Sequence, residues 1–294
     1  MEQVSKKALV QEKIRAPRKK RDGSAVVKTV LLAVSSLAMV YPLLWMISNS
    51  FKTADDIMGN PASLLPTVPN LSNFAGALTM APFDLYVFNS AFTAIVIVVI
   101  QLLLSVLFAF GIVFYSFPGK KVFYGAILLT YMLPTAATYV PSYVILAKMG
   151  LLDSLTGLIV SNLASVFTIF LLVQNFKGVP QELLQAAQIE GANQRQLLFR
   201  VVVPFSKSTL ITAGLINFVN MYNNYMWPSL ITTRKSKMLI SVGLNTFFTG
   251  QGNFKENLPR LMAANTLSVL PLLILFVVLQ KWFIKGISDS GLKG

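Results

Sequence analysis

Cysteine and histidine are both absent from this sequence of 294 residues. Their absence excludes disulfide bonds, metal sites built from cysteine or histidine, nucleophile–base pairs that use either residue, and histidine proton relays. The sequence therefore offers no catalytic residues of these classes and no metal site, and we do not expect an enzyme.

Charged residues are also scarce. They make up 12% of the chain, against about a quarter in soluble domains, while 54% of the residues are hydrophobic and the mean hydropathy is +0.64. This composition is typical of a membrane protein. The net charge of +14 comes from basic residues that flank apolar runs, so we expect contact with membrane lipid rather than with nucleic acid.

Six apolar stretches are long enough to cross a bilayer, which takes about 20 residues each. The first has no A-x-A-like cleavage site and is longer than the apolar region of a signal peptide, so we expect it to be retained. Pro134 and Pro141 predict a kink or break in the third. The sequence thus predicts an all-α, polytopic membrane protein with six transmembrane helices. They lie near residues 26–48, 86–115, 122–147, 154–176, 208–232 and 260–284.

The distribution of lysine and arginine predicts the orientation. With the N-terminus inside, the inside segments hold 18 of the 25 basic residues, so both termini are expected to be cytoplasmic. We therefore divide the chain into a basic cytoplasmic tail (1–25), a six-span transmembrane domain (26–284) and a cytoplasmic C-terminal tail (285–294). Residues 53–85, rich in proline, are expected to form an ordered extracytoplasmic loop.

The predicted spans lack both coupling charges and a nucleotide site. They contain essentially no Asp, Glu, Lys or Arg, which proton- or sodium-coupled transporters use to carry the coupling charge. The chain also has no G-x-x-x-x-G-K-[ST] phosphate loop. Three classes of protein fit these absences: a passive pore, a membrane scaffold, or one part of a machine powered by another protein.

A polar segment, residues 177–207, separates the fourth and fifth predicted spans. Pro180 suits the first position of a helix, because its missing N–H would be unpaired there in any case. Glu182 then falls in the first turn, where it is favourable against the helix dipole. Gly191 follows as the expected end of this helix, since glycine readily takes a left-handed conformation.

A second short helix is predicted to follow. Asn193 can cap its start, and Gln196 three residues later completes a pattern like a capping box. We expect this helix to continue until Pro204 ends it. The segment is then a pair of short helices at the cytoplasmic face, which either merely connects two spans or provides a docking surface.

Short motifs in this segment resemble those of a known family. Gln185-Ala186-Ala187, then Gly191, then Val201-Val202-Val203-Pro204 are similar to the EAA loop of ABC importer permeases, and Ile189-Glu190-Gly191-Ala192 is similar to a block of the sugar-type branch. The chain resembles the second, G-like permease subunit of carbohydrate-uptake systems of the maltose type. Further matching blocks are Ser50-Phe51-Lys52, Met132-Leu133-Pro134, Asn224-Tyr225-Met226-Trp227-Pro228 and the tail from Gly286 to Gly294.

The resemblance implies the type I ABC importer permease fold and a set of partners. These are a homologous second permease, two ATP-binding cassette ATPase subunits and an extracytoplasmic solute-binding protein. ATP and Mg²⁺ would be used by the ATPase subunits, with no cofactor bound by this chain. The implied location is the cell membrane of a bacterium or archaeon, with residues 53–85 and 234–259 as the loops that contact the binding protein.

The residues that the resemblance assigns to ATPase coupling lie in residues 177–207. The family glutamate is Gln185 here, which can offer only a neutral hydrogen bond to a partner, roughly half as strong as a charged one. Glu182 and Glu190 are the alternative carriers of the charge. The full coupling set is Glu182, Gln185, Ala186, Ala187, Glu190, Gly191, Ala192 and Pro204.

A dense run of polar and aromatic residues near the fifth span is the candidate translocation path. Asparagine side chains can hydrogen-bond to sugar hydroxyls, and aromatic rings can stack against sugar faces. The alternative is that these asparagines join helices through interhelical hydrogen bonds and that the aromatic residues belong to an interfacial belt. The candidates are Asn217, Asn220, Tyr222, Asn223, Asn224, Tyr225 and Trp227, with Asn245 nearby.

We therefore expect a permease subunit that moves a sugar or oligosaccharide and is coupled to ATPase subunits through its EAA loop. Two alternatives stay open. The same machine could carry glycerol phosphate or a polysaccharide fragment, or the chain could be a passive channel or scaffold in which residues 181–204 are only a connector.

Overall fold

A computed structural model of the chain describes residues 23–250 and 254–291, and within these ranges it contains helices and no strands. The helices are α2 (Gly23–Asn49), α3 (Ala54–Gly59), α4 (Ser72–Met80), α5 (Phe83–Phe114), α6 (Lys120–Thr130), α7 (Thr135–Lys148), α8 (Leu155–Val160), α9 (Val166–Lys177), α10 (Gln181–Ile189), α11 (Gln194–Gln196), the π-helix η1 (Leu197–Val202), α12 (Val203–Phe205), α13 (Lys207–Tyr222), α14 (Met226–Ile231), the 3₁₀-helix η2 (Lys235–Lys237), α15 (Ile240–Gly250) and α16 (Phe254–Gly291).

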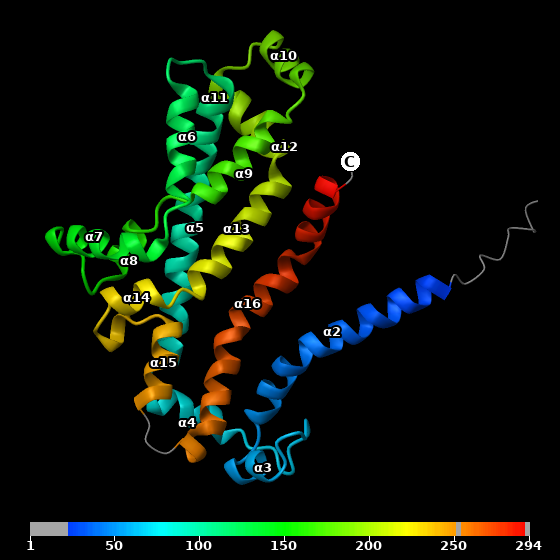
Figure 1. The fold of residues 1–294 in the computed structure, drawn as a ribbon, viewed down its shortest axis with the longest axis vertical. Helices are drawn as coiled ribbons and strands as arrows, with labels where there is room; N and C mark the ends of the chain where they lie inside the picture. Colours follow the sequence, from blue (N-terminus) through cyan, green and yellow to red (C-terminus); the bar gives the residue numbers. More distant parts are fainter. Residues whose placement is uncertain (1–22, 251–253, 292–294) are drawn as a thin grey trace, which may run out of the picture.

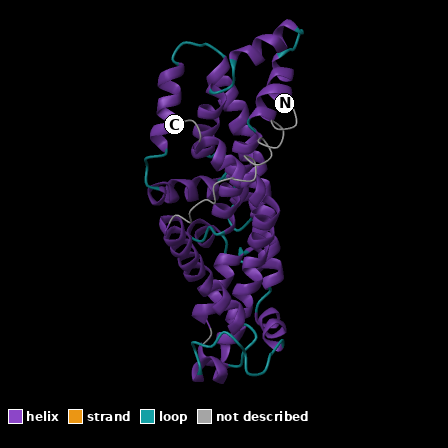
Figure 2. Cartoon of the chain, turned by 90° about the vertical axis from the view of Figure 1, so that its right-hand side faces the viewer, coloured by secondary structure: helices purple, strands orange, loops and turns teal. Residues whose placement is uncertain are grey.

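The molecule is elongated, and α5 runs along most of its length (Figure 1). The hairpin of α10 and α11 lies at one end, which we call the α10 end, and α3 and α4 lie at the opposite end. At mid-height, α7, α8 and α14 project to one side. The side view in Figure 2 shows the same elongated bundle of helices joined by short loops.

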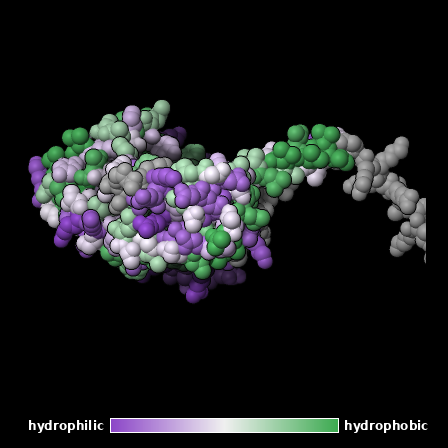
Figure 3. Space-filling model, turned by 90° about the horizontal axis from the view of Figure 1, so that it is seen from below, coloured by the Kyte–Doolittle hydropathy of each residue, from purple (hydrophilic) through white to green (hydrophobic). Residues whose placement is uncertain are grey.

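Three of the predicted spans are confirmed as long apolar helices. They are α2 and α5, together with the part of α16 from Lys255 to Lys281. The first of them, α2, is unlike the others because its most apolar stretch has no buried residue, and it leans away from the bundle (Figure 1). Figure 3 shows its apolar side chains exposed as an arm beside the polar α3–α4 end.

The prediction of six continuous spans is not confirmed. Within the described residues three helices are long and apolar enough to cross a membrane, or up to five if each bent pair is one span. The third predicted span is the pair α6 and α7, bent by 97°. Its break lies just before Pro134, as predicted, whereas Pro141 sits inside α7 without breaking it.

The fourth and fifth predicted spans are interrupted as well. Residues 161–165 separate the six-residue α8 from α9, which has 12 residues. Ser161 and Asn162 bond back to carbonyl groups of α8, and Ser165 caps α9, so these side chains replace bonds that a continuous helix would make. The fifth stretch ends as α13 at Tyr222 and resumes only as the short α14.

The predicted loop of residues 53–85 is ordered and packs against α16 through α3 and α4. Lys52, fully buried, donates from its Nζ to the carbonyl of Ser63. Asn73 donates to the carbonyls of Ser50 (3.0 Å) and Lys52 (2.8 Å). These bonds fix the loop to the end of α2.

The chain between α14 and α15 is also irregular, and polar side chains of α5 supply its hydrogen bonds. Asn89 donates from Nδ2 to the carbonyls of Ser236 and Met238, both at 3.1 Å, and Ser90 accepts from the N–H of Ile240 at 2.8 Å. These side chains satisfy backbone groups that lack regular helix partners, and they tie the irregular path to α5.

A close contact between α15 and α5 depends on a glycine. A Cβ added at Gly243 would lie 2.2 Å from Cδ2 of Tyr86. Tyr86 is buried and packs edge to face against Phe83, with ring centroids 5.8 Å apart, so its ring cannot move aside.

The projecting helices α7, α8 and α14 share a small apolar core around Leu158, Trp227 and Ile231. An ion pair between Asp153 and Arg234 joins the turn before α8 to the chain after α14. Asp153, in the turn before α8, accepts from the backbone N–H groups of Thr233 (2.9 Å) and Arg234 (3.0 Å), and the Arg234 guanidinium donates to its second oxygen. These bonds, those of the two N–H groups most, lower the pKa of Asp153 from 3.8 to about 2.

Replacing Gly243 tests the close contact. Gly243→Ala is expected to destabilise the protein by about 1–3 kcal/mol through overpacking against Tyr86, seen as a lower melting temperature of the purified protein in detergent. Gly111→Ala in α5 is the matched control, because a Cβ there meets no atom within 4 Å. An equal loss of stability in both variants would contradict the argument.

Two substitutions of Asp153 test the turn that it forms. Asp153 has a φ of +52°, which asparagine tolerates better than alanine, and an amide oxygen can still accept both N–H groups. Asp153→Ala is therefore expected to lower the melting temperature more than Asp153→Asn. Because the folded-state pKa is depressed, the wild type should lose its advantage over Asp153→Asn as the pH falls from about 4 to about 2. A pH-independent difference would count against the ion pair.

Candidate functional site

The segment of residues 177–207 forms two helical arms at the α10 end (Figure 1). The first arm is α10, which begins at Gln181, so Pro180 lies one residue before the helix rather than at its first position. Glu182 falls in the first turn, as predicted.

The turn between the arms follows the sequence prediction closely. Gly191 has a φ of +81°, and its N–H donates to the carbonyl of Gln188 at 3.0 Å. The predicted capping box is present: Gln196 donates its backbone N–H to Oδ1 of Asn193 (3.0 Å), and Asn193 donates its own to Oε1 of Gln196 (2.8 Å). Local side-chain chemistry therefore sets the angle between the arms.

The second arm differs from the prediction. Its middle, residues 197–202, is a π-helix, and the helical turns run past Pro204 to Phe205 instead of ending at the proline. The chain then bends by 75° into α13. A π-helical turn is wider than an α-helical one, and here it precedes the proline that lacks an N–H.

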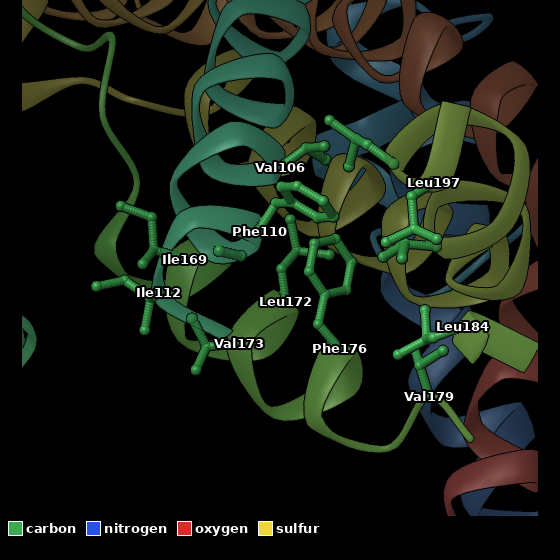
Figure 4. Close-up of a cluster of buried hydrophobic side chains, with 13 residues drawn as sticks. Val106, Phe110, Ile112, Ile169, Leu172, Val173, Phe176, Val179, Leu184 and Leu197 are labelled. Carbon is green, nitrogen blue, oxygen red and sulfur yellow. The ribbon is translucent and has the colours of Figure 1, made fainter. Parts of the chain in front are cut away.

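One face of this hairpin is anchored in an apolar cluster of buried side chains (Figure 4). Leu184 of α10 and Leu197 of η1 are buried in it. They pack with Phe110 of α5 and Phe176 of α9, which the figure shows pointing into the same space. The hairpin is thus attached to the two helices that run toward the middle of the molecule.

The opposite face is exposed. Among the predicted coupling residues, Ala187 and Ala192 are half-buried, while the others are exposed: Glu182, Gln185, Ala186, Glu190, Gly191 and Pro204. Sequence reasoning missed that Ile189 is 87% exposed and Leu183 48% exposed on the same helix. Apolar side chains left uncovered beside charged ones indicate a contact surface. The signal in the sequence was that α10 carries Leu183 and Ile189 in addition to Leu184, the one that is buried.

A cavity of about 810 Å³ lies at mid-height, where the two helix breaks face α5 and α13. Tyr131 and Leu133 line it from the α6–α7 break, and Phe167 lines it from the start of α9. Its polar lining residues are Gln101, Thr130, Thr135, Asn162, Ser165, Asn217 and Asn220.

Of the seven predicted path residues, Asn217 and Asn220 line this cavity. Asn217 also donates from Nδ2 to Oγ1 of Thr168 at 2.8 Å, a bond between α13 and α9. Sequence reasoning missed Gln101 and Asn162, although a carboxamide inside an otherwise apolar predicted span was a visible signal.

The other five predicted path residues lie outside the lining. Tyr222 and Trp227 are buried, and each donates a 2.8 Å hydrogen bond within the protein, to the carbonyl of Ser268 and to Oγ of Ser161. The remaining three, exposed or partly buried, are Asn223, Asn224 and Tyr225.

Comparison with known proteins concerns both the hairpin and the cavity. Residues 101–289, more than half of the chain, match the family described as "Binding-protein-dependent transport system inner membrane component". This range contains the cavity lining and the whole hairpin.

Full-length relatives are similar along nearly the whole chain. The sn-glycerol-3-phosphate transport system permease protein UgpE of Pectobacterium atrosepticum is 32% identical, over 92% of this chain and 98% of its own. The arabinooligosaccharides transport system permease protein AraQ of Halalkalibacterium halodurans is 29% identical, over 90% of this chain and 95% of its own.

A solved structure shares the fold. The crystal structure of a bacterial ABC transporter involved in the import of the acidic polysaccharide alginate contains a chain with a TM-score of 0.79 and 24% identity, covering 91% of this chain and 98% of that one. With the family match and the relatives, it leads to one conclusion: this chain belongs to the inner membrane components of binding-protein-dependent transport systems.

Proposed function

We propose that this chain is one of two permease subunits of an ABC importer that moves a sugar or oligosaccharide. The observation that carries the proposal is the hairpin of residues 177–207, exposed on one face and anchored on the other to helices that line an uncharged cavity. The names of the relatives, transport permeases for glycerol phosphate and for arabinooligosaccharides, support a cargo of small polyhydroxylated molecules.

The proposed topology places the α10 end in the cytoplasm. The positive-inside rule supports this side, and it puts both termini in the cytoplasm if the bent and interrupted stretches each count as one crossing, six in all. The α3–α4 end then faces outward. There, the loop of residues 53–85 and residues 234–259 would contact the solute-binding protein.

The exposed face of the hairpin is the proposed docking surface for an ATPase subunit. Glu182 and Glu190 supply charge, Gln185 supplies a neutral hydrogen bond, and Leu183 and Ile189 supply apolar area. ATP and Mg²⁺ bind to the ATPase subunits in this proposal, and this chain binds no cofactor. Closure of the ATPase pair would push the hairpin, and the apolar cluster would pass that motion to α5 and α9 as a rigid unit.

The second permease is the proposed partner at mid-height, where it would close the open side of the cavity. Two similar permeases, each contributing a lining of broken helices, would enclose a path between them. The exposed apolar α2 fits a position against lipid or against that second permease.

The hairpin's turn provides the test. Gly191→Pro fixes φ near −65° where the turn needs +81°, and it removes the N–H that bonds to Gln188. In a pull-down from native membranes, the tagged wild type is expected to retrieve an ATPase and a second permease, whereas the variant should lose most of the ATPase, roughly tenfold or more, while staying in the membrane.

Gly119→Pro is the matched control, because Gly119 also has a positive φ (+77°) but lies in the turn before α6. It should retain the ATPase. If the wild type retrieves no ATPase, the motor-docking function is wrong and a passive channel or scaffold becomes the better account.

A further inference from the structure

We infer that the cavity lining of this subunit selects an uncharged, polyhydroxylated cargo, which it contacts through Asn220 and Tyr131. This inference rests on the proposed function and deepens it, since transport permeases similar to this chain serve both anionic and neutral solutes by name.

The lining carries no charge. Among the described residues around the cavity there is no lysine, arginine, aspartate or glutamate; the polar groups are carboxamides, hydroxyls and one phenol. Moving a phosphate or carboxylate from water into such surroundings is costly unless a cation or a dense set of donors compensates for its lost hydration. A sugar hydroxyl, which is neutral, needs only one or two hydrogen bonds.

Several lining groups are already engaged in hydrogen bonds within the protein. Asn217 donates to Thr168, whose hydroxyl lies 2.9 Å from that of Ser165, and Asn162 donates from Nδ2 to the carbonyl of Leu158 at 2.9 Å. These bonds hold the α8–α9 break in place. They identify Asn217 and Asn162 as positioning residues of the cavity wall rather than as cargo contacts.

Gln101 has one group engaged and one buried without a partner. Its Nε2 donates to the carbonyl oxygen of Asn162 at 2.7 Å. A backbone carbonyl can only accept, so this bond fixes which end of the carboxamide is the nitrogen. The oxygen at the other end, Oε1, has no hydrogen-bond partner within the described part of the chain, although the residue is only 3% exposed. That oxygen is itself covered by protein, so Gln101 is a further positioning residue, which joins α5 to the α8–α9 break, and not a cargo contact.

Asn220 and Tyr131 provide the lining groups that are available to a cargo. Both side chains are exposed at the cavity, Tyr131 by 63%, and neither is bonded to another side chain or carbonyl of the described residues. The carboxamide of Asn220 can both donate and accept, as sugar hydroxyls require. The ring of Tyr131 offers a flat apolar face for the C–H side of a sugar.

The test uses the complete permease–ATPase complex in nanodiscs, without nucleotide and without the binding protein. Weak ligand binding is measured by saturation-transfer-difference NMR with three probes: arabinotriose, glycerol 3-phosphate and a trimer of mannuronate. Omitting the binding protein removes its own selectivity from the result. Arabinotriose is expected to bind saturably, and the two anions at least tenfold more weakly.

Variants assign the contacts. Asn220→Ala and Tyr131→Ala should each weaken arabinotriose binding roughly three- to tenfold, through the loss of one neutral hydrogen bond or of one stacking face. Both residues are exposed, so neither variant is expected to disturb folding. Asn223→Ala is the matched control for Asn220→Ala: the same residue type, also exposed, less than one helical turn away and outside the lining, it should bind as the wild type does.

Two results would overturn the inference. One is that the anions bind as tightly as arabinotriose, and the other is that arabinotriose binding is absent, or is unchanged in both Asn220→Ala and Tyr131→Ala. The proposed function is checked separately in the same sample by ATP hydrolysis stimulated by the binding protein. If hydrolysis is stimulated while anions bind, only the cargo class is wrong; if no ATPase stays in the complex, the proposed function fails.

Discussion

A chain that crosses a bilayer must satisfy its backbone N–H and C=O groups within the protein, and the irregular segments of this chain depend on α5 to do so. Gln101 bonds to the carbonyl of Asn162 at the α8–α9 break, and Asn89 bonds to two carbonyls beyond α14. Without these side chains the irregular segments would lose the hydrogen bonds that tie them to α5. The helix α5 is therefore also the support for the parts that are not regular.

The same helix joins the two functional features. Near its C-terminal end, Phe110 packs in the apolar cluster that anchors the hairpin, and Gln101, about two and a half turns earlier, lines the cavity. A force on the hairpin thus acts directly on a helix that borders the cargo path. In our proposal this short mechanical link replaces the coupling charges that the chain lacks.

Polar side chains in the membrane part divide into two groups by whether they have partners. Asn217, Tyr222 and Trp227 are buried and make hydrogen bonds between segments, which is the interhelical role that the sequence left open. Asn220 and Tyr131 line the cavity, exposed and without such bonds. Only this second group is free to exchange its hydration for cargo.

The sequence by itself determined the features that depend on neighbours within a few residues. The capping box of Asn193, the left-handed turn at Gly191 and the break before Pro134 all follow from local backbone chemistry, and three long apolar helices follow from composition. Only the tertiary structure decided where the fourth stretch breaks and which polar residues are engaged. The bonds responsible join residues 61, 49 and 66 positions apart, Gln101 to Asn162, Asn217 to Thr168 and Trp227 to Ser161. No local pattern encodes such pairs, because they form only when α5, α9 and α14 are brought together by packing.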